Sequence, residues 1–252
     1  MNILFTICAR AGSKGVKGKN TKNFCGKPLL FYTVAAYALF SRRYAKEMDN
    51  IILAVNTDSV ELLEQMDNLQ VDYVPVQREG ALAGDIVSKK DVIKDTLIKC
   101  ERKQKIVFDT VIDLDLTSPL RAVDDIKGTL DSLMQDQDAD IAFSVTDSRR
   151  SPYFNMVEKK EDGYYRTVKE TEYTTRQQSP VCYDMNASIY AYARAYLLSD
   201  VIFQRKAVVW KMKDTGILDI DSEEDLELME VIGSYLFEKR EEYRELFTWG
   251  ER

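Results

Sequence analysis

Residues 2–20 read NILFTICARAGSKGVKGKN, and this stretch decides the fold. Residues 2–8 form a short apolar run, which is typical of a buried strand in a parallel sheet. The loop that follows concentrates glycines, cations and a hydroxyl: Ala9, Arg10, Ala11, Gly12, Ser13, Lys14, Gly15, Lys17, Gly18, Lys19 and Asn20. Glycine lets backbone N–H groups close around phosphate oxygens, and cations neutralise their charge. The stretch therefore favours a strand followed by a nucleoside-triphosphate loop, although its composition also allows a solvated basic loop.

Two common nucleotide-binding motifs do not match this loop. A Walker A loop needs GxxxxGK[ST], and the register from Ser13 to Asn20 lacks both the first glycine and the final hydroxyl. The glycines also lack the GxGxxG spacing of dinucleotide-binding folds. The protein is therefore not a P-loop kinase or ATPase, and a dinucleotide fold is disfavoured.

Alternating strand and helix patterns continue along the chain and predict an α/β fold with a mostly parallel sheet. We expect strands over 51–57, 71–76, 110–116, 141–146, 187–193 and 207–212, and helices over 28–43, 59–66, 86–100, 123–135 and 222–243. Asp58 and Ser222 are expected to be N-caps. Residues 147–184 break the alternation and indicate an arm inserted into a single domain that spans 1–252.

Composition excludes several classes of function. The 252 residues include no His, so Ser-His-Asp triads and histidine zinc sites are absent. A net charge of -7 argues against nucleic-acid binding. The four cysteines lie far apart without a CxxC pair, which favours a reducing, cytoplasmic location. No apolar stretch approaches the ~20 residues needed to span a bilayer, so we expect neither a membrane segment nor a signal sequence.

An acidic run near the C-terminus offers a metal site. Asp219 and Asp221 are two positions apart on an extended approach, which points both carboxylates to one side. A pair of carboxylates facing a phosphate loop suits a Mg²⁺ ion that bridges protein and triphosphate. Ser222 and Asp225 resemble a capping box, so the acidity could instead serve only to start a helix.

The end of the arm carries side chains that suit a sugar acid. Arg176 could pair with a carboxylate, while Gln177, Tyr183 and Asn186 could hydrogen-bond hydroxyl groups. Composition equally allows a surface turn that leads into a strand.

Taken in chain order, these segments resemble the motif series of the acylneuraminate cytidylyltransferases. That family comprises the CMP-sialic acid synthetases and their bacterial relatives acting on legionaminic or pseudaminic acid. The resemblance runs from residue 2 to about 232 and rests on four motifs: Ala9-Arg-x-Gly-Ser-Lys-x4-Lys-Asn20, Thr117-Ser-Pro-Leu-Arg121, Arg176-Gln-x2-Pro180 leading to Asn186-Ala-x-Ile-Tyr190, and Asp219-Ile-Asp-x3-Asp225.

The resemblance implies a Rossmann-like nucleotidyltransferase that uses CTP, Mg²⁺ and a nonulosonic sugar acid and releases pyrophosphate. Catalysis would fall to Arg10, Lys19, Asp219 and Asp221, the last two holding Mg²⁺. The nucleotide would lie against Ala9, Arg10, Ala11, Gly12, Ser13, Lys19, Asn20 and Arg78, and the sugar acid against Asp115, Thr117, Ser118, Arg176, Gln177, Tyr183 and Asn186. The resemblance also implies a homodimer in which the arm reaches the neighbouring subunit's site.

One departure from the family pattern concerns the residue before the second motif. Family members often have Gln-Pro there, whereas this chain has Asp115-Leu116. Asp115 adds a negative charge to an anionic site, so it could bind metal, accept a hydrogen bond from the sugar or mark a different acyl sugar.

Two rival functions remain open. One is that of the CMP-Kdo synthetases, whose usual Gly-Asp-Glu-Pro segment is replaced here by Thr117 to Arg121. The other is a non-catalytic nucleotide-binding protein, against which the intact Lys19, Asp219 and Asp221 argue.

Overall fold

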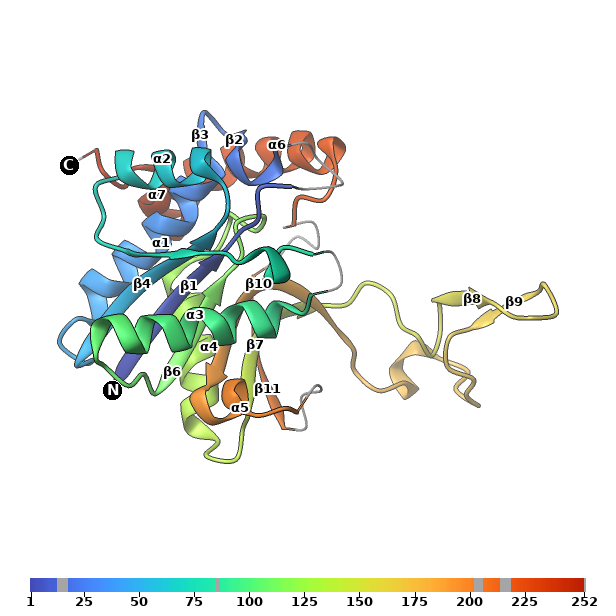
Figure 1. The fold of residues 1–252 in the computed structure, drawn as a ribbon. Coiled ribbons are helices and arrows are strands. Elements are labelled where there is room, and N and C mark those ends of the chain that lie inside the picture. Colours follow the sequence, from blue (N-terminus) through green and yellow to red (C-terminus); the bar gives the residue numbers. More distant parts are fainter. Residues whose placement is uncertain (13–17, 85–86, 202–205, 214–218, 252) are drawn as a thin grey trace.

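Parallel strands from the first half of the chain lie at the centre of a seven-stranded sheet (Figure 1). The computed structural model describes all residues except 13–17, 85–86, 202–205, 214–218 and 252. In sheet order the strands are β11 (Ala207–Lys211), β7 (Ile141–Asp147), β10 (Tyr183–Ala193), β6 (Thr110–Leu114), β1 (Asn2–Cys8), β4 (Asn50–Thr57) and β5 (Val74–Gln77). Only β10 runs antiparallel to its described neighbours, β6 and β7. The predicted mostly parallel sheet is confirmed.

Helices cover both faces of this sheet. They are α1 (Leu29–Tyr44), α2 (Val60–Asn68), α3 (Lys89–Gln104), α4 (Val123–Gln135), α5 (Arg194–Leu198), α6 (Glu223–Lys239) and α7 (Glu241–Phe247). Successive side chains of a strand point to opposite faces. Accordingly, Ile3, Phe5 and Ile7 of β1 enter a core shared with α1, α4, α6 and α7, whereas Leu4 enters a second core with α3 and α5. Burial on both faces explains why β1 reads as a continuous apolar run.

Helix ends show which local predictions hold. Ser222 caps α6, and its capping box with Asp225 is present as predicted. The N-cap of α2 is Ser59 rather than Asp58, because the Ser59 side chain accepts from Leu62 N. Asp58 instead accepts a hydrogen bond from the backbone N–H of Ala11 at 2.7 Å, and so ties the end of β4 to the loop after β1.

Several predicted boundaries were wrong. The strand expected over 71–76 is shorter and shifted, because β5 spans Val74–Gln77. The helix expected over 86–100 begins only at Lys89, and Ser88 provides its N-cap. The expected strand 187–193 starts earlier, at Tyr183, and contains a register shift. The single helix expected over 222–243 is divided, because Arg240 adopts an extended conformation (φ -126°, ψ 122°) between α6 and α7.

The predicted arm projects well away from the sheet and its helices (Figure 1). It leaves at the end of β7, returns at the start of β10 and carries a small antiparallel hairpin of β8 (Val157–Lys159) and β9 (Tyr165–Thr167), followed by the short helix η3 (Arg176–Gln178). Tyr164, Tyr165 and Val181 are each at least 67% exposed. The arm therefore presents apolar surface that the rest of the chain leaves uncovered.

Short elements complete the chain. Two-residue strands β2 (Asn23–Phe24) and β3 (Lys27–Pro28) form a hairpin before α1, and the one-turn helices η1 (Lys19–Thr21) and η2 (Gly80–Leu82) lie in the loops after β1 and β5. Within the described part of the chain, no helix is long and apolar enough to cross a membrane.

Candidate active site

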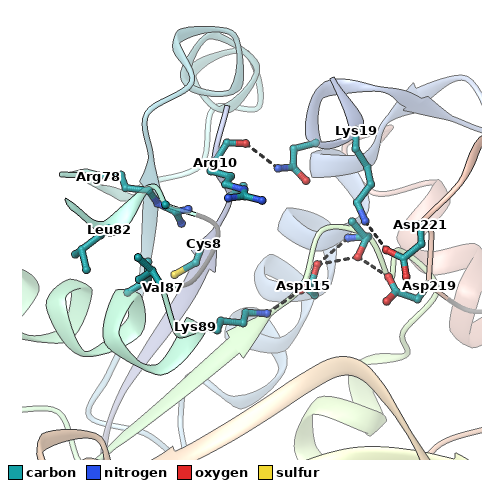
Figure 2. A pocket seen from close by; sticks show the side chains of 15 residues that line it. Cys8, Arg10, Lys19, Arg78, Leu82, Val87, Lys89, Asp115, Asp219 and Asp221 are labelled. Carbon is teal, nitrogen blue, oxygen red and sulfur yellow. Dashed lines mark hydrogen bonds and ion pairs between the residues drawn. The ribbon is translucent and has the colours of Figure 1, made fainter. Parts of the chain in front are cut away.

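A cavity of about 500 Å³ opens where β1 and β6 end (Figure 2). Ligands of open α/β sheets bind at this carboxyl edge, because the connecting loops diverge there. Residues from four loops and from α3 line the cavity: Cys8, Ala9, Arg10, Lys19, Asn20, Arg78, Leu82, Gly84, Val87, Lys89, Val92, Asp115, Thr117, Asp219 and Asp221. Segments more than 200 residues apart in sequence thus meet in one site, as the contact between Lys19 and Asp221 shows.

The basic side of the cavity comes from the loop after β1. Arg10 lies two residues after the end of β1, and Lys19 begins η1. Asn20 Nδ2 donates to the carbonyl of Arg10 at 3.0 Å, which holds the two ends of the loop together. The loop therefore aims two cations into the cavity, an arrangement suited to a polyphosphate.

The acidic side is formed by Asp219 and Asp221, just before α6. Lys19 Nζ donates to Asp221 Oδ1 at 2.9 Å, and Thr117 Oγ1 donates to Asp219 Oδ1 at 2.5 Å. Burial, together with the charges of Asp115 and Asp221, raises the pKa of Asp219. The ionised Asp219 carboxylate is therefore short of positive charge, and a bound cation would supply it.

These two carboxylates fit Mg²⁺ as partial rather than complete ligands. Among the described residues, no group of three His, Cys, Asp or Glu side chains could hold a metal ion. Mg²⁺ commonly binds to one or two carboxylates and completes its shell with water and substrate phosphate oxygens. The donor set at Asp219 and Asp221 matches that mode, in which metal and triphosphate bind together.

The other end of the cavity is less polar. Cys8, Leu82, Val87 and Val92 contribute apolar surface there. Arg78 is only 8% exposed, and its Nε donates to Asn56 Oδ1 at 2.9 Å. Such a wall, with one fixed guanidinium, offers a place for a nucleotide base.

The turn after β6 holds Thr117 in position. Arg121 is fully buried and donates to the carbonyls of Asp115 and Ser118. Burial lowers the pKa of Arg121 to about 10. The arginine of the Thr117–Arg121 motif therefore has a structural role: its hydrogen bonds to the two carbonyls hold the turn beneath the cavity.

Lys89 is a cavity residue that the sequence did not single out. It begins α3, and its Nζ lies 2.8 Å from Asp113 Oδ2 and 2.7 Å from Asp115 Oδ2. A lysine at the start of a helix is ordinary, so nothing local marked it. The sequence did carry one signal for such a residue. Asp113 and Asp115 stand at the end of a predicted central strand, and two acids there require a cation from another part of the chain.

The cavity brings together Ala9, Arg10, Lys19, Asn20, Arg78, Asp115, Thr117, Asp219 and Asp221 from the predicted site. Ala11 and Gly12 are exposed and are not among the lining residues, and Ser13 lies outside the described residues. Ser118 and Asn186 are buried beneath it: Ser118 Oγ donates to the Asn186 carbonyl at 3.3 Å, and Ser144 Oγ donates to Asn186 Oδ1 at 2.6 Å. These two residues support the site from below.

Three predicted sugar-binding residues belong to the arm or its root rather than to the loops around the cavity. Gln177 borders a separate, smaller hollow at the base of the arm, and Tyr183 is 45% exposed at the start of β10. The backbone of Arg176 lies in η3. The cavity of this chain therefore leaves their predicted role at a sugar acid as a prediction.

Comparison with known proteins agrees with this geometry. Residues 4–243 match a family model described as cytidylyltransferase. The chain is 37% identical over 231 residues to CMP-N,N'-diacetyllegionaminic acid synthase of Campylobacter jejuni, which covers 91% of this chain and 94% of that protein. It is 37% identical over 234 residues to post-translational flagellin modification protein B of Campylobacter coli, with the same two coverages, and 28% identical over 241 residues to a pseudaminic acid cytidylyltransferase of C. jejuni (92% and 96%).

The solved structures show the same fold. The structure of CMP:2-keto-3-deoxy-manno-octonic acid synthetase complexed with CTP superposes with a TM-score of 0.63 at 17% identity, covering 93% of this chain and 99% of that one. A family match across nearly the whole chain, relatives at 37% identity and a shared fold lead to one conclusion. The chain belongs to the cytidylyltransferase family.

Proposed function

We propose that this protein transfers CMP from CTP to the anomeric hydroxyl of a nonulosonic acid and releases pyrophosphate. The observation that carries the proposal is the cavity in which Arg10 and Lys19 face Asp219 and Asp221. The relatives at 37% identity include a CMP-N,N'-diacetyllegionaminic acid synthase, which supports this class of sugar acid as the acceptor. All four cysteines are free thiols, which supports a reducing, cytoplasmic setting.

The reaction depends mainly on positioning and charge neutralisation, which this cavity can supply without histidine. The sugar hydroxyl attacks the α-phosphorus as pyrophosphate leaves. Arg10 and Lys19 would neutralise the negative charge that builds on the phosphate oxygens. Asp219 and Asp221 would hold Mg²⁺, which when bound supplies further positive charge to the triphosphate.

Nucleotide selectivity tests the proposal. We expect pyrophosphate release with CTP to exceed that with ATP, GTP or UTP by roughly tenfold or more at a fixed sugar acid, because a base-sized pocket discriminates by shape and hydrogen bonding. The measurement is a coupled pyrophosphate assay with Mg²⁺ and a panel of legionaminic, pseudaminic and N-acetylneuraminic acids, with Kdo as the rival acceptor. Equal turnover with a purine nucleotide would contradict the base assignment, and a preference for Kdo would contradict the sugar class.

We propose further that the protein is a homodimer with composite sites. Exposed apolar residues on the arm, such as Tyr164, Tyr165 and Val181, support a covering partner. The second support is that Gln177 and Tyr183 do not line their own subunit's cavity. In such a dimer, Arg176 of one subunit would serve Lys19 and Asp219 of the other.

Complementation between inactive variants checks the composite site. Lys19→Ala and Arg176→Ala should each be inactive as pure dimers, yet recover about a quarter of wild-type activity when co-refolded. Random pairing makes about half of the dimers mixed, and each mixed dimer holds one intact site. Light scattering should first show a dimer. A monomer, or mixed dimers that recover nothing, would rule out sharing of the arm.

A further inference from the structure

Lys89 places one positive charge between two carboxylates, Asp115 at the cavity and Asp113 buried behind it. Its ammonium lies within 2.8 Å of Asp113 Oδ2 and at 2.7 Å from Asp115 Oδ2. About a third of the Lys89 side chain is exposed, and it lines the cavity (Figure 2). The lysine comes from the first turn of α3, whereas the carboxylates come from the end of β6 and the turn that follows.

Asp115 is fully engaged by these contacts. Its Oδ1 accepts from Thr117 N at 3.0 Å and lies 2.9 Å from Thr117 Oγ1, whose single proton it shares with Asp219 Oδ1, while Oδ2 accepts from Lys89. Burial alone would raise the pKa of Asp115, but Lys89 and the Thr117 hydrogen bonds hold that pKa well below its usual range. Asp115 is therefore ionised, and each of its oxygens contacts a protein donor.

Asp113 adds a second negative charge beneath the first. Its carboxylate has no exposed surface, and Oδ1 accepts from Thr6 Oγ1 at 2.7 Å. Burial alone would lower the pKa of Lys89, yet the charges of Asp113 and Asp115 hold it well above its usual value. The ammonium therefore stays charged, and the triad of Lys89, Asp113 and Asp115 has a net charge of -1 rather than -2.

This charge matters because a triphosphate must enter the same cavity. Two unneutralised carboxylates beside it would repel the nucleotide at short range in a partly desolvated site. Thr117 also joins Asp115 to Asp219, so a displaced Asp115 would disturb the acidic side as well.

We propose that Lys89 is a positioning residue for nucleotide binding: it neutralises Asp113 and Asp115, and thereby permits an aspartate at position 115 in a cavity that accepts a nucleoside triphosphate. The inference rests on the proposed use of CTP. Lys89 acts through the two aspartates, which it holds in place.

Direct CTP binding to the full-length protein, measured by calorimetry with Mg²⁺, tests this role. Lys89→Met changes the triad charge to -2 and should weaken CTP binding by about 10- to 100-fold. Adding Asp115→Asn returns the charge to -1 and should bring the dissociation constant back to within about threefold of wild type. Lys94→Met is the matched control. Lys94 lies on the same helix as Lys89, pairs with Asp200 and does not line the cavity. Its effect should stay within about twofold.

A second variant protects the test against misfolding, because Lys89→Met leaves Asp113 buried without its cation. Asp113→Asn/Asp115→Asn keeps Lys89 and changes the triad charge to +1, so it should bind CTP more tightly than wild type, by about tenfold. The inference is overturned if folded Lys89→Met binds CTP like wild type, if Asp115→Asn gives no recovery, or if the double asparagine variant binds no tighter. Wild-type protein that binds no CTP would instead overturn the proposed function and, with it, this role.

Discussion

Asp219→Asn should reduce turnover by roughly 10²-fold or more and, at the same time, raise the melting temperature of the ligand-free protein. The loss of activity follows because the substitution removes a charge that would hold Mg²⁺ at the triphosphate, with little change in side-chain size. The gain in stability follows from the pKa of Asp219, which burial raises in the folded state. Steady-state kinetics and thermal melting without divalent ions measure the two effects.

The sign of the stability effect depends on pH. A carboxyl whose pKa is raised on folding binds its proton more tightly in the folded state, so ionising it above that pKa costs stability. Asparagine removes this cost at neutral pH, and the difference between variant and wild type should vanish as the pH falls below the carboxyl's unfolded pKa of about 4. A melting temperature that drops at neutral pH would contradict this account of Asp219.

Asp221→Asn tests the second proposed metal ligand, and Glu224→Gln is the control for removing a nearby acid. Asp221 lines the cavity and contacts Lys19, so its variant should also lose roughly 10²-fold in turnover. Glu224 is an exposed acid in the first turn of α6 outside the cavity and should be dispensable. Near wild-type activity in both aspartate variants would mean that the acidic run serves only to cap α6.

Lys19→Ala should lower kcat by roughly 10²-fold while leaving the KM of the sugar acid nearly unchanged. The Lys19 ammonium contacts Asp221 Oδ1 at 2.9 Å, beside the proposed metal site, where charge would develop during transfer. Interactions made chiefly in the transition state affect kcat. Initial rates over both substrate concentrations separate the two constants.

Lys22→Ala is the matched control for Lys19. Lys22 pairs with Glu223 at 2.7 Å and does not line the cavity, so its loss should change turnover little. If Lys19→Ala raises only the KM of the sugar acid and leaves kcat unchanged, then Lys19 contacts the sugar acid rather than the reacting phosphate, and its assignment here is wrong.

The fold was predictable where local pattern and tertiary packing agree. The strand β1 and the helix α4 have the expected bounds, because an apolar run and an amphipathic period both mark buried faces. The antiparallel direction of β10 had no local signal, since its alternation reads the same in either direction. The choice between Asp58 and Ser59 as a cap depended on the contact of Asp58 with Ala11, which is 47 residues distant.

The candidate site was predictable where its residues follow strands or precede a helix. Arg10, Thr117 and Asp219 occupy such positions, and all three line the cavity. Lys89 was not predictable, because its partner Asp115 lies 26 residues further on and on another element. The arm projects away from the sheet of its own chain, so its predicted role at a sugar acid stays a prediction.

The fate of the phosphorus atoms of CTP tests the central claim most directly. The protein is incubated with Mg²⁺, a nonulosonic acid and CTP labelled at either the α- or the γ-phosphorus, and the products are separated. The account predicts that the α-label appears in a phosphodiester with the sugar acid, in equal amount to γ-label released as pyrophosphate, and only when the sugar acid is present. Release of the α-label as free CMP, release of the γ-label as inorganic phosphate, or no turnover with any nonulosonic acid would contradict it.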